Sequence, residues 1–431
     1  MECGRRMFRR LAGVFAARVP ELGLGRVPDP RSKRGRRWKL PTLLKATLLA
    51  LTAGCKGLSE MEVLMSTLSP GTRRLFGIHR RVPDTTMRDV LCRVDPQALR
   101  ICLREQLRAA SRRKALAPID PTFPFGVITC DGKGTALGFW DDEYAQRHAN
   151  DTTKEAYGLL RTVTCCLVTA RSRPCVDAVP IPPETNEMGI FPTVFDGLVA
   201  KYGRLFQVVT YDAGGASEEN ARRVVEAGKD YVLRMKDERR VMLKTAKLVG
   251  KDAQPLAFTE DTLSNPTEVR REVFLVEARG DCDDGLVWTH AKTFVRVRSQ
   301  TRKHGSITAT DDRWFVTSLA QDRLTPSQWL WLIRAHWAVE NNCHGTFDRF
   351  FREDEHPWIE LCPRGAAVVL ILRRIAYNAL ALFRAVTQRS EEKRNMPWKK
   401  LLGAVRDMLI AARDDDVDEL RKRPEVALAS S

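Results

Sequence analysis

The chain has 431 residues, enough for a catalytic domain with its own hydrophobic core and one or two accessory domains. Hydrophobic residues make up 43% of the sequence, which argues against a disordered or fibrous protein. Lys and Arg outnumber Asp and Glu by 71 to 54, giving a net charge of +17 that attracts polyanions. We therefore expect nucleic acid as the partner, with a merely solvated basic surface as the alternative.

Residues 1–40 carry clustered Arg and Lys, ending in DPRSKRGRRWKL, together with glycines and prolines. We predict a flexible basic arm suited to contacts with phosphates. Over residues 41–116 the apolar spacing becomes helical, with a helix in LPTLLKATLLALTAG that ends at Gly54, a second in LSEMEVLMSTL, and one or two more in TTMRDVLCRVDPQALRICLREQL, broken at Pro96. This segment is predicted to be a small helical domain that binds DNA or, alternatively, serves a structural or dimerising role.

The proline-rich linker APIDPTFPFG precedes a change of periodicity in residues 124–236. Three consecutive runs rich in β-branched residues, FGVITCDG, LLRTVTCCLVTA and CVDAVPI, are typical of strands. A helix in MGIFPTVFDGLVAKYG, a strand in RLFQVVTYDAGG, a helix between Ser217 and Gly228, and a strand in DYVLRMK follow. This order of elements predicts an α/β fold with an RNase H-like catalytic core.

The rest of the chain divides into three segments. Residues 237–324 contain alternating stretches such as TEVRREVFLVEA, FVRVRSQT and RWFVTSLA, which predict a β-rich insertion. Helix returns in residues 325–387, where Thr325 and Gln328 form a predicted capping box, and this segment is expected to be the helical second part of the core. Residues 388–431 are charged and are predicted to form a peripheral tail.

Cysteine usage and apolar runs bear on the compartment. The eleven cysteines include no CxxC pair, which favours reduced, mostly buried thiols in a cytosolic protein over disulfides or zinc. Pro20 and the acidic Glu2 and Glu21 interrupt the Arg-rich start, against a targeting peptide. The apolar run at residues 46–55 is about half as long as a membrane span requires, so we expect no contact with membranes.

Two aspartates follow apolar runs that are predicted to be strands. Asp131 comes after residues 125–128 and precedes a glycine, and Asp212 comes after VVTY and precedes Ala-Gly-Gly. Ligands collect at strand ends in open α/β sheets. A single aspartate at such a place is more often a turn former or a helix cap, but two in one predicted sheet favour a functional site.

Glu340 belongs to a predicted helix and shares a face with apolar residues. Leu330, Ile333 and Trp337 precede it at spacings of three and four, so the carboxylate is expected on a largely apolar face and needs a cation or solvent. A structural ion pair with Arg334 is the alternative. A zinc site formed by His336, Glu340 and His344 is a second alternative, although it lacks the HExxH spacing of zinc hydrolases.

Together the three carboxylates fit phosphoryl transfer with two divalent cations, and their hard oxygen ligands favour Mg²⁺, with Mn²⁺ as a substitute. The sequence around them resembles the DDE transposases of bacterial insertion sequences, particularly the ISAs-type group. The resemblance runs from about Asp29 to the helix after Glu340. Its motifs are DPRSKRGRRWKL with LLALTAG and LSE, which resemble the transposase-associated domain, VITCDGKG, YDAGGASEEN, DYVLRMK, DRWFVTSL and LIRAHWAVENNCHGTFDRFFRED. It implies that Asp131, Asp212 and Glu340 are the catalytic, metal-binding triad.

The resemblance also implies an activity and its partners. The expected protein is a DNA transposase that binds the terminal inverted repeats of an insertion sequence, hydrolyses a phosphodiester and joins the freed 3′-hydroxyl to target DNA. Double-stranded DNA, a homo-oligomer with a dimer on DNA, and a bacterial cytoplasmic, nucleoid-associated location follow from it. The alternatives are a domesticated or inactive copy that only binds DNA, and an RNase H-like nuclease without joining activity.

The residues around the third acid depart from the family pattern. Related enzymes often carry Y-x₂-R-x₃-E-x₆-K there, whereas this chain has His336 four residues before Glu340 and Phe347 seven residues after it. Contacts with DNA are therefore expected from other groups near the acids. The candidates are Lys133, Lys236, Arg334, His336, Asn341, Arg349 and Arg352.

Overall fold

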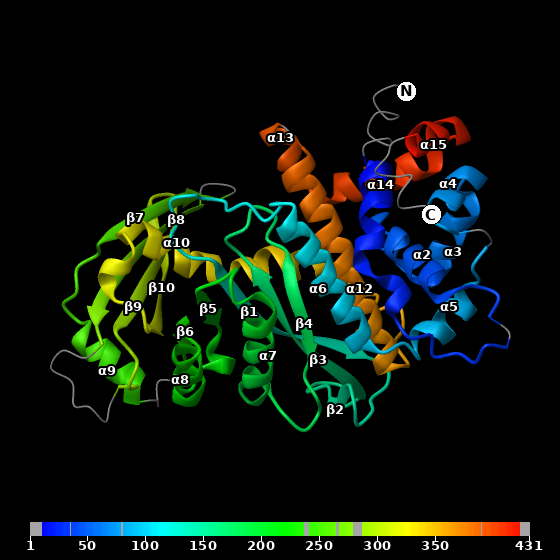
Figure 1. Ribbon diagram of the computed structural model, residues 1–431. Coiled ribbons are helices and arrows are strands. Elements are labelled where there is room, and N and C mark those ends of the chain that lie inside the picture. Colours follow the sequence, from blue (N-terminus) through cyan, green and yellow to red (C-terminus); the bar gives the residue numbers. More distant parts are fainter. Residues whose placement is uncertain are drawn as a thin grey trace.

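The computed structural model describes residues 11–34, 36–78, 81–236, 241–263, 267–278, 287–388 and 390–422. Within them the strands form one ten-stranded mixed sheet. Figure 1 shows the N-terminal helices and α14–α15 gathered at one end of this sheet and strands β7–β10 at the other. The molecule is thus of mixed α/β class.

The N-terminal region is helical, as the apolar spacing predicts. Its helices are α2 (Leu40–Thr52), α3 (Leu58–Thr67), α4 (Pro70–Leu75), α5 (Asp84–Leu91) and α6 (Pro96–Arg112). Helix α2 ends just before Gly54, whose φ of 74° is a left-handed conformation that favours glycine. Helix α6 begins at Pro96 because the Asp95 side chain accepts a hydrogen bond from the Gln97 amide and caps it.

Part of the predicted basic arm is folded rather than flexible. Residues 11–18 are helical and continue into two 3₁₀ turns, η1 (Val19–Leu22) and η2 (Leu24–Arg26). Leu11, Leu22 and Leu24 are buried in the same apolar core as α2. Burial of these leucines stabilises the folded form of the segment. Its charge and glycine content gave no indication of this. The first ten residues of the predicted arm lie outside the described part of the chain.

The central strands have the RNase H-like order. These are β1 (Val127–Leu137), β2 (Ala145–Ala149), β3 (Ala156–Leu167), β4 (Cys175–Pro180), β5 (Val208–Tyr211) and β6 (Asp230–Met235). Strand β1 is antiparallel to β3 and parallel to β5, β3 is antiparallel to β4, and β5 is parallel to β6. The resulting order β4-β3-β1-β5-β6 confirms the predicted core and places β1 and β5 at its centre.

Helices cover both faces of this core. Helices α7 (Glu187–Tyr202) and α8 (Glu218–Glu226) pack on one face, where Phe191 and Phe195 of α7 lie in a core shared with Ile128 and Val209. On the other face, Val127 and Val208 share a second core with α10 (Pro326–His336) and α12 (Pro363–Leu382). The Thr325–Gln328 capping box predicted for α10 is present.

One helix has the length and apolar composition of a membrane span. It comprises α12 and the π-helical η6 (Phe383–Thr387), with a mean hydropathy of 1.7. Because 89% of its most apolar stretch is buried inside the protein, the helix satisfies its apolar surface within the fold.

The segment between the second and third acids extends the same sheet. It contains α9 (Val241–Val249), β7 (Ala257–Thr262), β8 (Thr267–Glu277), β9 (Thr293–Lys303), β10 (Ser306–Thr317) and the short turn η4 (Gln321–Arg323). The last residues of β10 pair antiparallel with β6, so the order β6-β10-β9-β8-β7 continues outward from the core. The insertion is therefore hydrogen-bonded to β6, the first strand after Asp212.

The C-terminal segment packs against the N-terminal helices, unlike the peripheral tail that its charge predicts. It forms α13 (Glu391–Arg394), α14 (Trp398–Ala411) and α15 (Asp414–Arg421). Leu401, Leu402 and Val405 of α14 are buried in the core with α2. The Asp414 carboxylate accepts hydrogen bonds from the Gly71 amide at 2.8 Å and the Ser69 hydroxyl at 3.0 Å. An apolar face at helical spacing outweighs the charge of the segment.

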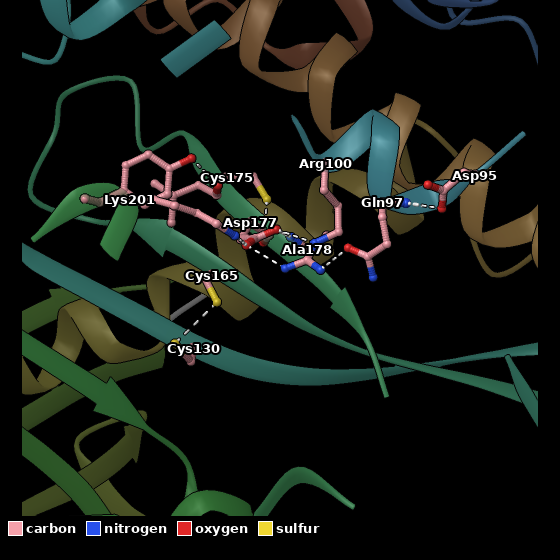
Figure 2. Close-up of polar contacts among 11 residues, drawn as sticks. Asp95, Gln97, Arg100, Cys130, Cys165, Cys175, Asp177, Ala178 and Lys201 are labelled. Atoms are coloured by element: carbon pink, nitrogen blue, oxygen red, sulfur yellow. Dashed lines mark hydrogen bonds and ion pairs between the residues drawn. The ribbon is translucent and has the colours of Figure 1, made fainter. Parts of the chain in front are cut away.

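A buried ion pair joins the helical region to the core (Figure 2). Both carboxylate oxygens of Asp177, in β4, lie 2.8 Å from the Arg100 guanidinium of α6, and Lys201 of α7 lies 3.2 Å from one of them. Burial raises the pKa of Asp177, but the Arg100 hydrogen bonds and both positive charges outweigh it and lower the pKa. The junction therefore depends on an ionised Asp177.

The cysteines of the described residues are free thiols, and all but Cys92 and Cys362 are buried. The expectation that the cysteines are mostly buried is thus confirmed for the described residues. Two pairs approach closely within the core: the sulfurs of Cys130 and Cys165 lie 3.4 Å apart. Those of Cys166 and Cys343 lie 2.9 Å apart and connect β3 to the segment that carries Glu340.

Candidate active site

Asp131 and Asp212 lie at the same level of two adjacent parallel strands. The register pairs Cys130 of β1 with Tyr211 of β5, and each aspartate is the next residue. Neighbouring strands are about 4.8 Å apart, so the two carboxylates start from adjacent backbone positions. Asp131 is not at the end of its own strand, because β1 continues to Leu137 beside β3. The site forms where β5 ends and β1 loses its parallel neighbour.

Two histidines connect α10 and the following segment to these strands. The Nδ1 atom of His336 lies 3.1 Å from the Thr210 hydroxyl, two residues before Asp212. Burial lowers the pKa of His336 to about 4 against the opposing effect of Asp212 and Asp131, so the ring is neutral at pH 7. The Nδ1 atom of His344 lies 3.2 Å from Asp131 Oδ2. These contacts fix the helical segment across β1 and β5.

One basic residue of β6 and another just after it bind the second aspartate. Arg234 and Lys236 lie 3.3 and 3.2 Å from the two carboxylate oxygens of Asp212. Tyr211 pairs with Leu233, which places Arg234 beside Asp212. Asp212 is therefore neutralised by two cations in this structure, whereas Asp131 contacts a histidine.

Glu340 is exposed, so the prediction of a mostly apolar face around it is wrong. Helix α10 ends at His336, and residues 339–344 form the π-helical segment η5 (Val339–His344). A π-helix has more than 3.6 residues per turn and rotates the following side chains relative to an α-helix. Val339 and His344 are consequently buried, while Glu340 faces solvent. The segment η5 nevertheless contacts β1, the strand of Asp131.

A pocket of about 470 Å³ lies beside Glu340 and is rich in arginine. Its polar and aromatic lining is Arg234, Arg271, Ser299, Arg313, Arg334, Trp337, Glu340 and Asn341. The Arg313 guanidinium lies 4.6 Å from the centre of the Trp337 ring, a cation–π contact. Arg271 and Arg334 share one carboxylate, Asp261. Positive charge from β6, β8, β10 and α10 therefore converges at the exposed third acid.

Sequence reasoning missed Arg234, Arg271 and Arg313 as pocket residues. All three are on strands. The alternation of polar and apolar residues along a strand does not show which of its two faces meets a distant helix. Arg334 and Asn341, which were predicted as DNA contacts, do line the pocket. Lys236 lies close by through its contact with Asp212.

The remaining predicted DNA contacts are placed differently. His336 is buried, and the Lys133 ammonium, whose side chain is only 7% exposed, is held by Asp348 and Asp354. These two side chains are therefore not free at the surface, because each has been recruited to a contact within the fold. Arg349 is exposed. Arg352 is paired with Glu355 three residues later.

Glu187 is a fourth carboxylate near the site, and sequence reasoning missed it. It lies in the first turn of α7, which the Asn186 side chain caps by accepting a hydrogen bond from the Gly189 amide. Burial and the charges of Asp131 and Asp212 raise the pKa of Glu187 above its usual range. A glutamate just after an N-cap is ordinary in sequence, so only the folded chain reveals its neighbours.

A buried charge cluster supports the segment after Glu340. Glu353 is fully buried and pairs with Arg374 of α12, and Arg373 lies 3.9 Å from the same oxygen. The Arg374 guanidinium also lies 4.0 Å from the centre of the Phe347 ring. Phe347, the residue at the position where related enzymes often have Lys, is thus a core residue here.

The donor set can be compared with the needs of a metal ion. Carboxylate oxygens suit hard divalent cations, and Asp131 and Asp212 are adjacent as such a site requires. Across the described residues, however, no three or more His, Cys, Asp or Glu side chains converge as a preformed site would. This includes His336, Glu340 and His344, so the zinc alternative lacks support. The carboxylates fit a divalent cation chemically, but they are turned toward His344, Arg234 and Lys236.

The chain is similar in sequence to known proteins. Residues 23–106 match the family model described as DDE_Tnp_1-associated. The chain is 23% identical over 392 residues to the "H repeat-associated putative transposase YhhI" of Escherichia coli (strain K12), covering 86% of this chain and 93% of that protein. The chain resembles DDE transposases. YbfL of the same organism is similar to the same extent, 23% over 392 residues.

A solved structure is also similar to this transposase-like chain. It is the synaptic complex of the piggyBac transposase with hairpin DNA, with a TM-score of 0.43 and 12% identity, covering 96% of this chain and 80% of that one. The RNase H-like character of the core rests on the strand order described above.

Proposed function

We propose that the protein is a DNA transposase that cuts the ends of an insertion sequence and joins them to target DNA. The observation that carries the proposal is the register of β1 and β5, which sets Asp131 and Asp212 side by side at the centre of an RNase H-like sheet. Glu340 is the third acid of the proposed triad. It is carried on a segment that His344 ties to Asp131.

The three acids are proposed to hold Mg²⁺, or Mn²⁺ in its place. Bound divalent cations would activate the attacking oxygen and stabilise the leaving oxygen of the phosphodiester. Lys236 and Arg234 pair with Asp212 in this structure. They would become available to phosphate oxygens if that carboxylate held a metal ion instead. The neutral His336 supports β5 without adding charge.

Double-stranded DNA, as element ends and as target, is the proposed partner. The net charge of +17 attracts DNA of any sequence. The arginine-rich pocket beside Glu340 is a candidate binding site for the DNA backbone next to the scissile phosphate. A dimer on DNA would bring two element ends together. Arginines from the insertion would contact the DNA backbone in place of the Arg and Lys that often flank the third acid in related enzymes.

The proposal is tested with duplex oligonucleotides that carry the inverted repeats flanking the gene, incubated with the full chain and Mg²⁺ or EDTA. We expect Mg²⁺-dependent hydrolysis at the element end, followed by a product in which the 3′-hydroxyl is joined to target DNA. Denaturing gels of end-labelled strands separate the two products. Cutting without joining would favour the nuclease alternative, and binding without cutting would favour a domesticated copy.

Replacing Arg313 by Gln tests the pocket separately. Loss of one charged contact is expected to weaken binding of the DNA end about tenfold, or ~1.4 kcal/mol, and to reduce the slope of log affinity against log salt by about 1. Fluorescence anisotropy over a salt series without Mg²⁺ measures both. Arg222→Gln is the control, because Arg222 is exposed on α8, a helix that packs on the opposite face of the sheet. Equal effects of the two variants would remove the pocket from the proposed interface.

A further inference from the structure

Glu187 reaches the paired aspartates from the side of the sheet opposite to η5. Helix α7 packs through Phe191 and Phe195 against the core that contains Ile128 and Val209, whereas η5 packs against the other core. Helix α7 also contacts the 3₁₀ turn η3 (Ala213–Gly215) that follows Asp212. The Glu187 carboxylate therefore lies beside the segments that follow Asp131 and Asp212.

Two glycines make room for this carboxylate. A Cβ atom added to Gly132, the residue after Asp131, would lie 1.9 Å from Glu187 Oε1. A Cβ atom added to Gly214, two residues after Asp212, would lie 2.3 Å from Oε2. Both distances are far below a van der Waals contact, so any side chain at either position would displace the glutamate. The two oxygens of Glu187 thus occupy a cradle between the two aspartate-bearing segments.

Polar groups in this cradle lack partners. Among the described residues, no hydrogen bond or ion pair engages the half-buried Glu187 carboxylate. The nearby cations are used elsewhere: Arg161 donates to the Thr185 carbonyl at 2.7 Å, and Lys236 binds Asp212. The fully buried Tyr211 hydroxyl, on the residue before Asp212, has no partner within the described part of the chain either. Unsatisfied buried polar groups are rare in folded proteins and indicate an unseen ligand, such as an ion with its water.

We propose that Glu187 is a further ligand of the divalent cation, binding it together with Asp131 and Asp212. This inference rests on the proposed function, because it adds a fourth carboxylate to the same site. Glu187 supplies the oxygen from the α7 side, where Gly132 and Gly214 permit its approach. To bind the same ion, Asp131 would turn its side chain away from His344, and Asp212 would turn away from Arg234 and Lys236. Such rotations are fast at partly exposed positions.

Binding of Mn²⁺ to the full chain, measured by electron paramagnetic resonance without DNA, tests the inference. Glu187→Gln keeps the shape and removes the charge, and it is expected to weaken Mn²⁺ binding at least about tenfold. Gly132→Ala changes no charge but fills the cradle, and it is expected to weaken binding similarly. Glu184→Gln is the matched control, since Glu184 is exposed three residues earlier, and its affinity should equal that of the parent.

Thermal unfolding in EDTA and in Mn²⁺ gives a second readout. A metal ligand held near two like charges destabilises the protein without metal, so Glu187→Gln should unfold in EDTA at the same temperature as the parent or higher. Its gain from Mn²⁺ should be smaller, because ligand-induced stabilisation follows affinity. A lower midpoint in EDTA with unchanged Mn²⁺ affinity would show a purely structural Glu187 and overturn the inference.

The aspartates separate this inference from the proposed function. If Asp131→Asn loses Mn²⁺ binding while Glu187→Gln binds like the parent, the fourth ligand is refuted and the triad stands. If Asp131→Asn, Asp212→Asn and Glu187→Gln all bind like the parent, the metal site of the proposed function fails as well.

Discussion

Replacing Asp131 or Asp212 by Asn is expected to lower the rate of DNA-end cleavage by about a thousandfold or more. Loss of one ligand removes several kcal/mol of transition-state stabilisation by the bound cation, and each ~1.4 kcal/mol is a factor of ten in rate. Because the two aspartates are adjacent in the sheet, both substitutions should affect hydrolysis and joining alike. Single-turnover assays with end-labelled DNA measure the two steps.

Binding and a matched substitution control this prediction. Both variants should still bind the DNA end, since asparagine removes negative charge and no basic group is lost. Asp322→Asn, at an exposed position in the turn before α10, should cut at the parental rate. Cleavage by Asp131→Asn and Asp212→Asn within about threefold of the parent would refute the assignment of the triad.

Replacing Asp177 by Asn is expected to lower the free energy of unfolding by about 3 kcal/mol. The substitution leaves Arg100, whose side chain is 14% exposed, without its anion, and removal of one partner from a buried pair costs about 3–5 kcal/mol. The lower value applies because Arg100 retains Gln97 and some solvent. Urea unfolding at pH 7 measures the change. Asp196→Asn is the control, because its pair with Arg223 is exposed and worth at most about 1 kcal/mol.

The effect of Asp177→Asn should depend on pH in one direction. The folded protein holds the pKa of Asp177 below its ordinary value. The carboxylate therefore contributes stability above the ordinary pKa of about 4, and this contribution is lost as the pH falls through the lowered pKa. The difference between parent and variant should be constant near neutrality and shrink below about pH 4. A difference that grows on acidification would contradict the ion-pair interpretation.

Local patterns predicted most elements of the fold. Helix α2 and its end before Gly54, the cap of α8 at Ser217 and the capping box of α10 all follow from interactions within a few residues. The run of three strands, helix, strand, helix and strand likewise follows from local periodicity, and the RNase H-like order was predicted from it. Such features need no knowledge of distant contacts.

Predictions failed where a distant partner outweighs local composition. The segment at residues 11–26 and helix α14 look basic or charged, yet leucines such as Leu11 and Leu402 bury them in a shared core. Near Glu340 the α-helical spacing breaks down because α10 gives way to the π-helical η5. The π-helical turn coincides with contacts of His336 and His344 to two distant strands. Apolar periodicity carries no information on such distant contacts, so it could not predict the wider turn.

The candidate triad divides in the same way. Sequence alone predicted Asp131, Asp212 and Glu340 as the candidate triad and predicted an RNase H-like sheet, because strand-forming runs, turn glycines and long motifs are local features of the chain. Only the tertiary structure decided that Asp131 and Asp212 are direct neighbours, that arginines of β6, β8 and β10 surround Glu340, and that Glu187 lies in the cradle of Gly132 and Gly214. Those relations depend on register and packing between segments far apart in sequence, which local patterns do not encode.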